Sequence, residues 1–300
     1  MSIPNEITAF CSGSKGQLLS AAKPMTQAEF NRFSEFIIAQ CGIKMPPSKK
    51  IMLEARLQKR LRVLGFGSFR EYFEHIRSKA GRGEVVHMLD AVTTNKTDFF
   101  REPGHFQFLA GTVLPAFIEG RGDARVSGQC FRIWSAGCST GEEPYTLAMV
   151  LADFTDRHPT FRFAVLASDL STKVLDRARE AIYDEGRTAG VPLSLKQRYF
   201  LRNKDRSKAL LRIVPSLRAM VQFQRVNLMD EALVAPDPFD AIFCRNVIIY
   251  FDRGTQERLL RRFCGMLRPG GYLFLGHSES IHGFDLPLIR MTSTVHRRCE

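Results

Sequence analysis

The sequence predicts an α/β fold preceded by a small domain made only of helices. Residues 24–90 carry amphipathic helical patterns, whereas from Phe131 onward strand and helix patterns alternate along the chain. Such alternation is typical of a parallel sheet with helices on both faces. Residues of about 190–224 are basic and hold short, partly alternating segments, which predicts an inserted antiparallel β-subdomain.

The composition is that of an ordinary globular protein. With 300 residues, 44% hydrophobic and 10% aromatic content, the chain can bury a substantial core. We find no signal-peptide pattern and no run of about 18 apolar residues, so we expect a cytoplasmic protein with no membrane insertion. Seven scattered cysteines contain no C-x-x-C pair and predict neither a zinc site nor a redox motif. The net charge of +12 would attract nucleic acid, anionic lipid or an acidic helix equally well.

The helical domain is expected to follow a flexible tail. Residues 1–23 lack periodicity and form this tail in our prediction. Thr26 and Glu29 have the spacing of a capping box, and the helix that they open is expected to end near Gly42.

A second helix is predicted at residues 48–64, with Ser48 as its N-cap and a leucine at every third or fourth position. Ser68 and Glu71 then open a further helix through a second capping box. The faces of the second helix away from the leucine stripe are strongly basic. They carry Lys49, Lys50, Arg56, Lys59, Arg60 and Arg62.

A polar, turn-rich connector at residues 91–105 joins the helical domain to the α/β domain of residues 106–300. Its adjacent Phe99 and Phe100 are expected to pack against the folded part. In the α/β domain we predict strands at 131–136, 161–168, 241–244 and 272–276 and helices at 141–154, after Ser171 and through 259–266. The helix after Ser171 is expected to turn Val174, Leu175, Ala178 and Ile182 inward, and the segments 209–214 and 219–224 are assigned to the antiparallel β-subdomain.

A ligand site is predicted where the parallel strands end, because helix N-termini present free N–H groups there. The turn at residues 136–141 is made of small residues, which let a ligand approach the backbone. Glu142 and Glu143 follow it, and at a helix start they would repel a pyrophosphate and favour a sulfonium cofactor with an ammonium group. Asp169 ends the second strand, where it can hold both ribose hydroxyls or cap the next helix.

Five stretches, in this order along the chain, resemble the chemotaxis receptor methyltransferase family, CheR. They are TTNKTDFFRE (93–102), WSAGCSTGEEPY (134–145), ASDLS (167–171), FDAIFCRNVIIYFD (239–252) and LRPGGYLFLGHSE (267–279). The resemblance covers the chain from about residue 25 to the end. It implies a Rossmann-like class I methyltransferase sheet, S-adenosylmethionine as the cofactor, and methyl transfer to glutamate side chains of chemoreceptors.

The resemblance also implies roles for single residues. Those that match cofactor contacts are Asn95, Thr97, Arg101, Glu143, Asp169, Asn227, Leu228, Arg245 and Asn246. Asn227 and Leu228 look like the pair that flanks the adenine, and Arg101 with Tyr250 matches the residues that orient the reacting carboxylate. No metal is implied.

The implied chemistry agrees with the lack of an obvious catalytic dyad. A glutamate carboxylate has an unperturbed pKa of about 4.3, so it is ionised at neutral pH and needs no general base. Alignment of the reacting atoms and exclusion of water then supply most of the acceleration. From the residues alone, Arg101 could instead pair with Asp98 or Glu102, and Tyr250 could be a core aromatic.

The partner implied by the resemblance is the cytoplasmic domain of a chemoreceptor. The basic helix 48–64 is suited to dock on an acidic receptor helix. The β-subdomain matches the part that in some members binds a receptor's C-terminal peptide by strand addition. Here Asn203-Lys204-Asp205 stands where tethered members carry a glycine-rich turn, which puts that tether in doubt.

Other functions agree less well with the sequence. A methyltransferase of RNA or of another protein is the alternative, but the basic helix has no aromatic platform and the motif after the fourth strand is CRNVIIYFD, not N-P-P-Y. A non-catalytic adaptor would show damage at Arg101, Asp169 or Tyr250, and all three are intact. A nicotinamide dehydrogenase would need G-x-G-x-x-G, which the first turn lacks. We therefore expect no nucleic-acid partner.

Overall fold

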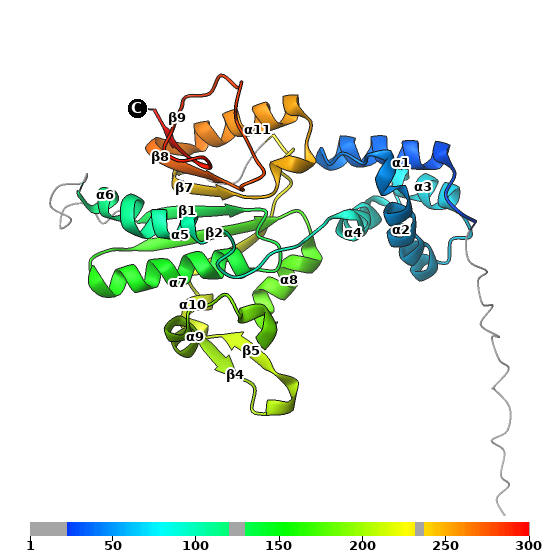
Figure 1. The fold of residues 1–300 in the computed structure, drawn as a ribbon. Coiled ribbons are helices and arrows are strands. Elements are labelled where there is room, and N and C mark those ends of the chain that lie inside the picture. The colour runs from blue at the N-terminus through cyan, green and yellow to red at the C-terminus, as the bar shows by residue number, and fades with distance from the viewer. Residues whose placement is uncertain (1–22, 120–129, 232–236, 300) are drawn as a thin grey trace, which may run out of the picture.

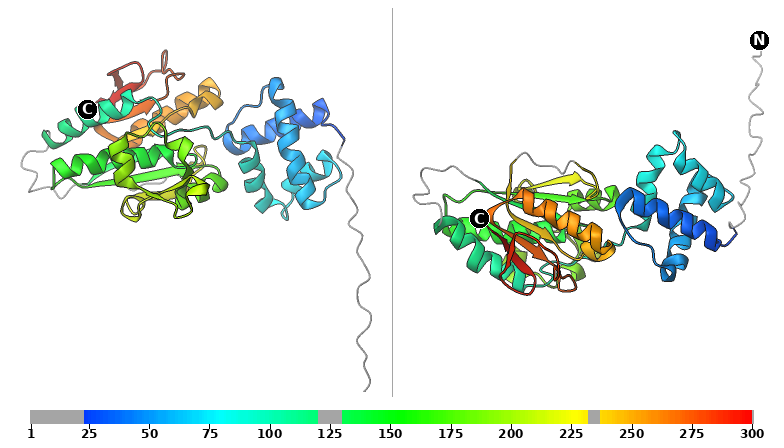
Figure 2. Two further views of the ribbon diagram at one scale, coloured as in Figure 1. Left: turned by 60° about the horizontal axis from the view of Figure 1, so that its bottom comes forward. Right: turned by 90° about the horizontal axis from the view of Figure 1, so that it is seen from above.

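The computed structural model describes residues 23–119, 130–231 and 237–299. Figure 1 shows a helical domain beside a larger domain that is built on a twisted sheet, with an extended segment running between them. Figure 2 shows the same separation from two further directions. Apart from Lys23, the predicted tail lies outside the described residues. None of the described helices is long and apolar enough to cross a membrane.

The helical domain consists of α1 (Gln27–Cys41), the 3-10 turn η1 (Pro47–Lys49), α2 (Lys50–Leu64), α3 (Phe69–Arg77) and α4 (Arg82–Val92). Their apolar faces meet in one core, where Phe33, Leu57 and Tyr72 are fully buried. The ring of Phe33 stacks on that of Tyr72 at 6.1 Å. This packing lets a small domain hold α2 in a fixed orientation.

The capping predictions in this domain are met unequally. The box of Thr26 and Glu29 is present in full. Ser68 accepts from the Glu71 N–H, but the Glu71 carboxylate accepts from the Gly67 N–H and not from that of Ser68. The second box is therefore half formed. The prediction for Ser48 is wrong. Because proline fixes φ and lacks an N–H, the chain first makes the η1 turn, and α2 begins two residues later without a side-chain cap.

The larger domain contains a seven-stranded sheet in the order β6-β2-β1-β7-β8-β10-β9. Its strands are β1 (Phe131–Ala136), β2 (Phe163–Asp169), β6 (Val221–Arg225), β7 (Phe239–Cys244), β8 (Leu267–Leu275), β9 (Leu288–Arg290) and β10 (Val295–Arg298). The first five strands of the sheet order are mutually parallel, and β10 runs antiparallel to both of its neighbours, β8 and β9.

Helices bury both faces of this sheet. Along β1, Ile133 contributes to the core on one face and Trp134 to the core on the other, as the two-residue period of a strand requires. The first face is covered by α5 (Gly104–Phe108), the π turn η2 (Leu109–Val113), α6 (Leu114–Glu119) and α7 (Glu142–Arg157), and the second face by α11 (Arg253–Met266). The predicted α/β class with a helical N-terminal domain is confirmed.

A small antiparallel sheet is inserted after α8 (Thr172–Glu180). It consists of β3 (Ile182–Asp184), β5 (Leu210–Ile213) and β4 (Phe200–Arg202), in the order β3-β5-β4, with η3 (Glu185–Thr188), α9 (Leu193–Tyr199) and η4 (Arg206–Lys208) in its connections. We call this unit, residues 182–213, the small sheet. It lies below α7 in the view of Figure 1. The predicted antiparallel addition is therefore present.

Two predictions near the small sheet are wrong. The segment 219–224 belongs to β6, which follows α10 (Pro215–Arg218) and pairs in parallel with β2 at the edge of the main sheet. Because an edge strand has one neighbour and stays partly exposed, its residues alternate like those of a surface antiparallel strand. Ile182 does not face inward. Ala181 adopts φ 54° and ends α8, so Ile182 starts β3 and is 44% exposed.

Candidate functional site

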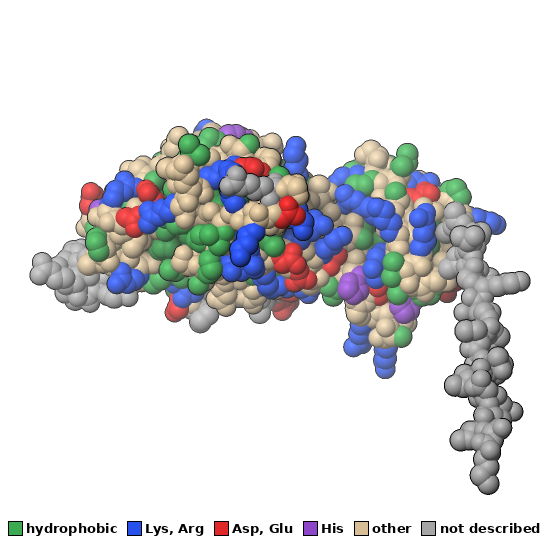
Figure 3. Space-filling model, turned by 90° about the horizontal axis from the view of Figure 1, so that it is seen from below, with side chains coloured by type: hydrophobic (Ala, Val, Ile, Leu, Met, Phe, Trp, Pro, Cys, Tyr) green, Lys and Arg blue, Asp and Glu red, His purple; other side chains and the backbone are tan. Residues whose placement is uncertain are grey.

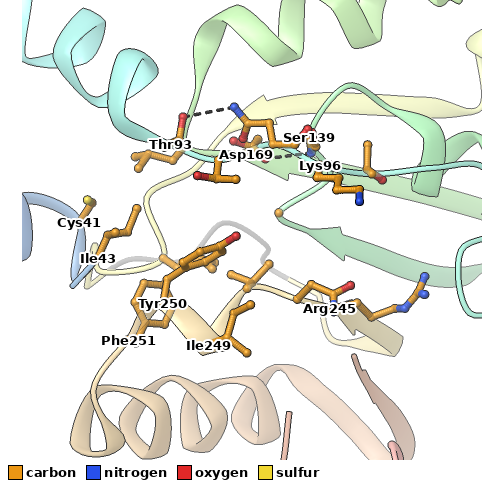
Figure 4. Close-up of a pocket in the computed structure, with 18 of the residues that line it drawn as sticks. Cys41, Ile43, Thr93, Lys96, Ser139, Asp169, Arg245, Ile249, Tyr250 and Phe251 are labelled. Atoms are coloured by element: carbon orange, nitrogen blue, oxygen red, sulfur yellow. Dashed lines mark hydrogen bonds between the residues drawn. The ribbon is translucent and has the colours of Figure 1, made fainter. Parts of the chain in front are cut away.

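A cavity of about 320 Å³ lies between the helical domain, the connector and the carboxyl ends of β1, β2 and β7. Figure 4 shows its side chains converging from these elements. All the predicted site residues line it: Asn95, Thr97, Arg101, Glu143, Asp169, Asn227, Leu228, Arg245, Asn246 and Tyr250. Segments more than 150 residues apart in the sequence thus meet around one space.

The turn after β1 is shaped to bring backbone close to this cavity. Gly137 has φ 89°, and a Cβ there would lie 2.5 Å from a methyl group of Val247. Asp169 fixes the same turn, because its Oδ2 accepts the Ser139 N–H at 2.9 Å. Its Oδ1 accepts the Ser171 N–H, whereas the cap of α8 is the Ser171 hydroxyl. Asp169 therefore does not cap the helix, and its carboxylate lies in the cavity wall.

A buried charge network lies behind the cavity. Arg245 places Nη1 3.0 Å from Glu143 Oε2 and Nη2 3.1 Å from Glu102 Oε2, and its side chain is 2% exposed. The other Glu143 oxygen accepts from the Ser135 hydroxyl at 2.7 Å. Burial raises the pKa of Glu143, which Arg245 opposes. Arg245 is thus engaged by two carboxylates and holds Glu143 at the cavity.

Glu279 supports the opposite wall and was not among the predicted residues. Its carboxylate accepts N–H bonds of 2.6–2.8 Å from Gly276, Asn246, Val247 and Ile248. It fixes Asn246 at φ 59°, a conformation that few residues other than glycine adopt. A glutamate shortly after a predicted strand was the available signal, but three of its four partners lie about thirty residues earlier in the chain.

Arg101 lies in the connector. It donates from Nη1 to the Lys96 carbonyl at 3.0 Å. Among the described ion pairs, none joins Arg101 to Asp98 or Glu102, the partners that the sequence had left open. The guanidinium lines the cavity with further N–H groups available to a ligand.

Tyr250 lines the cavity, and its partly buried ring also packs against the core of the larger domain. Its hydroxyl points toward the middle of the space in Figure 4. The Lys49 ammonium lies 5.3 Å from the centre of its ring. The Tyr250 carbonyl accepts the Lys44 N–H at 2.9 Å, which binds this turn to the helical domain.

The helical domain supplies part of the wall, which the sequence had not indicated. Its cavity-lining residues are Cys41, Ile43, Met45, Lys49 and Val92. Asn227 links the loop after β6 to the helical domain, since its Nδ2 donates to the Gln40 carbonyl at 2.7 Å. Its Oδ1 accepts the Met229 N–H. The cavity is therefore shared by both domains.

One group of possible metal ligands occurs in the part of the chain that the structure describes. Glu102, His105 and His277 each place a ligand atom within 4.8 Å of the others. Arg245 Nη2 is 3.1 Å from the same Glu102 oxygen. A fixed guanidinium charge at this position opposes a cation, so the donor set does not suit a metal.

The basic helix α2 is less uniformly exposed than its sequence suggests. Arg60 pairs with the buried Glu84 at 2.6 Å, and Arg56 donates to the carbonyls of Val92 and Thr93. Both side chains therefore serve the fold of the helical domain. Figure 3 still shows Lys and Arg side chains gathered on this domain.

Comparison with known proteins agrees with this geometry. The model of the family described as "CheR methyltransferase, SAM binding domain" matches residues 95–296, and that of the "CheR methyltransferase, all-alpha domain" matches residues 28–93. The chain belongs to the CheR methyltransferase family. Its cofactor, as for the family, is S-adenosylmethionine, and its activity is cofactor-dependent methylation in chemotaxis.

CheR relatives from three bacteria match most of the chain. A chemotaxis protein methyltransferase of Escherichia coli is 42% identical over 272 residues, which cover 91% of this chain and 91% of the relative. That of Borreliella burgdorferi is 40% identical, covering 86% and 90%. Chemotaxis protein methyltransferase 2 of Pseudomonas aeruginosa is 40% identical, covering 87% and 90%.

Proposed function

We propose that this cavity binds S-adenosylmethionine and that the enzyme transfers the methyl group to glutamate side chains of chemoreceptors, leaving methyl esters and S-adenosylhomocysteine. The receptor part would be its cytoplasmic domain, which places the enzyme in the cytoplasm. The observation that carries the proposal is the convergence of all the predicted site residues, from both domains and the connector, on one cavity.

The charges of the cavity suit a cationic cofactor. Glu143 and Glu102 face a single guanidinium, that of Arg245, so the network has one negative charge in excess when both carboxyls are ionised. A buried excess charge is costly unless a counter-charge is present, which an ammonium group near Glu143 would supply. Asp169 would accept from the ribose hydroxyls, since this residue lines the cavity and is 8% exposed.

The adenine would lie toward the helical domain. Asn227 and Leu228 line this end, next to the apolar side chains of Cys41 and Ile43. A purine needs apolar faces and a few polar groups at its edge, and these residues provide both. Cofactor binding would then draw on both domains.

Arg101 and Tyr250 would position the substrate carboxylate. The methyl carbon bonds to a carboxylate oxygen as its bond to sulfur breaks, and the negative and positive charges of the reactants are both neutralised. Because the glutamate is already ionised, these residues need only align it. A strong ion pair would weaken the nucleophile, so hydrogen bonds from one guanidinium and one hydroxyl suit the task.

Docking would use the basic residues of α2 that remain free of the fold's own contacts. Lys59 and Arg62 are exposed on this helix. They suit an acidic helix of the receptor. A second and separate contact would be a receptor C-terminal peptide that adds to the edge strand β4, where Leu201 is 50% exposed.

The test is transfer of tritiated methyl from S-adenosylmethionine to a purified receptor cytoplasmic fragment. A methyl ester is labile to mild alkali, so the label should be released as methanol. Asp169→Ala should abolish transfer by weakening cofactor binding. Asp156→Ala is the matched control, because Asp156 pairs with Arg198 on the surface and lies outside the cavity. Alkali-stable label on RNA or another protein, with none on receptor fragments, would refute the substrate assignment.

A further inference from the structure

The connector is held over the cavity by side chains that bind its carbonyl oxygens. Ser139 Oγ donates to the Asn95 carbonyl at 3.2 Å, and Arg245 Nη2 donates to the Arg101 carbonyl. Between them, Arg187 Nη2 donates to the Thr97 carbonyl at 2.9 Å. Ser139 and Arg245 line the cavity themselves, whereas Arg187 does not and comes from η3 of the small sheet.

The same nitrogen of Arg187 also meets a buried carboxylate. It lies 2.6 Å from Oε1 of Glu142, whose side chain is 0% exposed at the start of α7. The other Glu142 oxygen accepts from the Thr140 hydroxyl at 2.6 Å. Arg187 is itself 40% exposed, so it reaches inward from the surface. One guanidinium thus links the connector, the first turn of α7 and the small sheet.

Apolar contacts support the connector at the next residues. The buried ring of Phe99 packs edge-on against Tyr183 of β3 at 4.9 Å and Phe200 of β4 at 5.5 Å. At Gly190, a Cβ would lie 2.8 Å from the Phe99 carbonyl oxygen, so the two backbones approach closely. The small sheet therefore packs directly against the connector.

The path of the connector needs such support. Phe100 and Glu102 adopt φ of 54° and 57°, which costs free energy in residues other than glycine. The connector nevertheless supplies cavity residues 93–98 and Arg101. A connector released from its contacts would relax and withdraw part of the cavity wall.

We propose that Arg187 is a positioning residue, through which the small sheet holds the connector in the conformation that completes the cofactor cavity. The inference rests on the cofactor site proposed above. It gives the small sheet a part in cofactor binding, although none of its residues, 182–213, lines the cavity.

The test compares Arg187→Met, the double variant Arg187→Met with Glu142→Gln, and Arg202→Met. Methionine keeps the length of the stem and removes the donors. Glu142→Gln removes the carboxylate that would otherwise stay buried without a counter-ion, so the double variant separates loss of the connector contact from that charge cost. Arg202 is the control, because it forms an ion pair of 3.0 Å with Glu185 on the same sheet and is 74% exposed.

The readouts are the Kd of S-adenosylhomocysteine by calorimetry, the KM for S-adenosylmethionine, and kcat. Loss of a hydrogen bond from a charged donor predicts a Kd and KM raised about tenfold in both Arg187 variants, with kcat at saturating cofactor within about twofold. Arg202→Met should bind as the parent does. The double variant should recover thermal stability without recovering affinity.

An unchanged Kd in the double variant would overturn the inference, as would a lowered unfolding temperature with no change in affinity. Asp169→Ala keeps this failure distinct from failure of the cofactor site. If Asp169→Ala also leaves the Kd unchanged, the cavity assignment fails. If Asp169→Ala weakens binding and the Arg187 variants do not, only the role of Arg187 fails.

Discussion

Two buried carboxylates determine the shape of the turns around the cavity. Asp169 accepts two backbone N–H groups and Glu279 accepts four. Burial raises the pKa of each, while the N–H bonds favour the ionised form. Such carboxylates take the place of water as hydrogen-bond acceptors for backbone N–H groups, which would otherwise be costly to bury. The turns are thus fixed before any ligand binds.

Tyr250→Phe tests the role of one hydroxyl at this site. The ring would remain beneath Lys49, so the cavity should keep its form and the KM for S-adenosylmethionine should not change. Loss of a hydrogen bond to the substrate carboxylate predicts a kcat lowered about tenfold or more. Initial rates with a receptor fragment measure this. A variant with parental kcat would assign Tyr250 to packing alone.

At this scale, the sequence predicts residues that follow strands better than residues whose partners are distant. Asp169 could be selected because it ends a strand, and Glu143 because it begins a helix. Glu279 and the helical-domain residues Cys41 and Ile43 could not, because their positions depend on how separate segments meet. The ion pairs of Arg245 with Glu143 and Glu102 likewise join residues more than 100 positions apart in the sequence.

Helix α2 has two kinds of basic residue. Arg56 and Arg60 bind the helical domain's own carbonyls and carboxylate, whereas Lys59 and Arg62 are exposed. Glu84 illustrates the first kind, because Arg60 and the Tyr72 hydroxyl both donate to it and lower its pKa against the effect of burial. Only the second kind is available to a partner.

The pair of substitutions Lys59→Ala and Arg62→Ala should raise the KM for the receptor fragment by about tenfold and leave the Kd of S-adenosylhomocysteine unchanged, because rim charges act mainly on association. The effect should weaken as salt is increased.

Arg60→Met is the contrasting variant. It leaves Glu84 buried without its cation and should lower the free energy of unfolding by about 3 kcal/mol. Urea unfolding and methylation rates separate the two, and equal KM values with and without the alanines would exclude α2 from docking.

The elements themselves followed from local patterns, except where pairing partners mattered. Strands such as β1 and β7 are buried on both faces and appear as continuous apolar runs. Strand β6 is short and partly exposed, so its sequence contains no information on whether it pairs with β2 or with β5. Likewise, the proline pair before α2 delayed the helix in a way that its leucine spacing did not indicate.

For the whole molecule, stability should depend on pH through His105. This side chain is 3% exposed, its Nε2 is 2.6 Å from the Thr294 hydroxyl, and its Nδ1 is 3.5 Å from Glu102. Burial, and then the charge of Arg245, lowers the pKa of His105 from 6.5 to about 4. Between these values the unfolded chain binds the proton and the folded chain does not. The free energy of unfolding should therefore fall as the pH drops from about 6.5 to 4, by about 3 kcal/mol in total.

His105→Gln removes this proton while keeping a side chain that can bond Thr294. Urea unfolding of the parent and the variant at pH 7 and pH 5 gives the comparison, in which carboxylates that titrate in both proteins cancel. The parent should lose more stability than the variant between the two values. Parallel losses would mean that His105 is protonated in the folded protein.

Because two domains share the cavity, the binding equilibria of the cofactor and of the receptor are connected. A ligand that contacts Cys41 and Ile43 on one side and Asp169 on the other restricts how the domains move against each other. If receptor docking on α2 favours the same arrangement of the two domains, cofactor and receptor must strengthen each other's binding. The factor is the same for both, because binding the cofactor first or the receptor first leads to the same complex with the same total free energy. The same reciprocity applies to the demethylated cofactor, so release of one product would be coupled to release of the other.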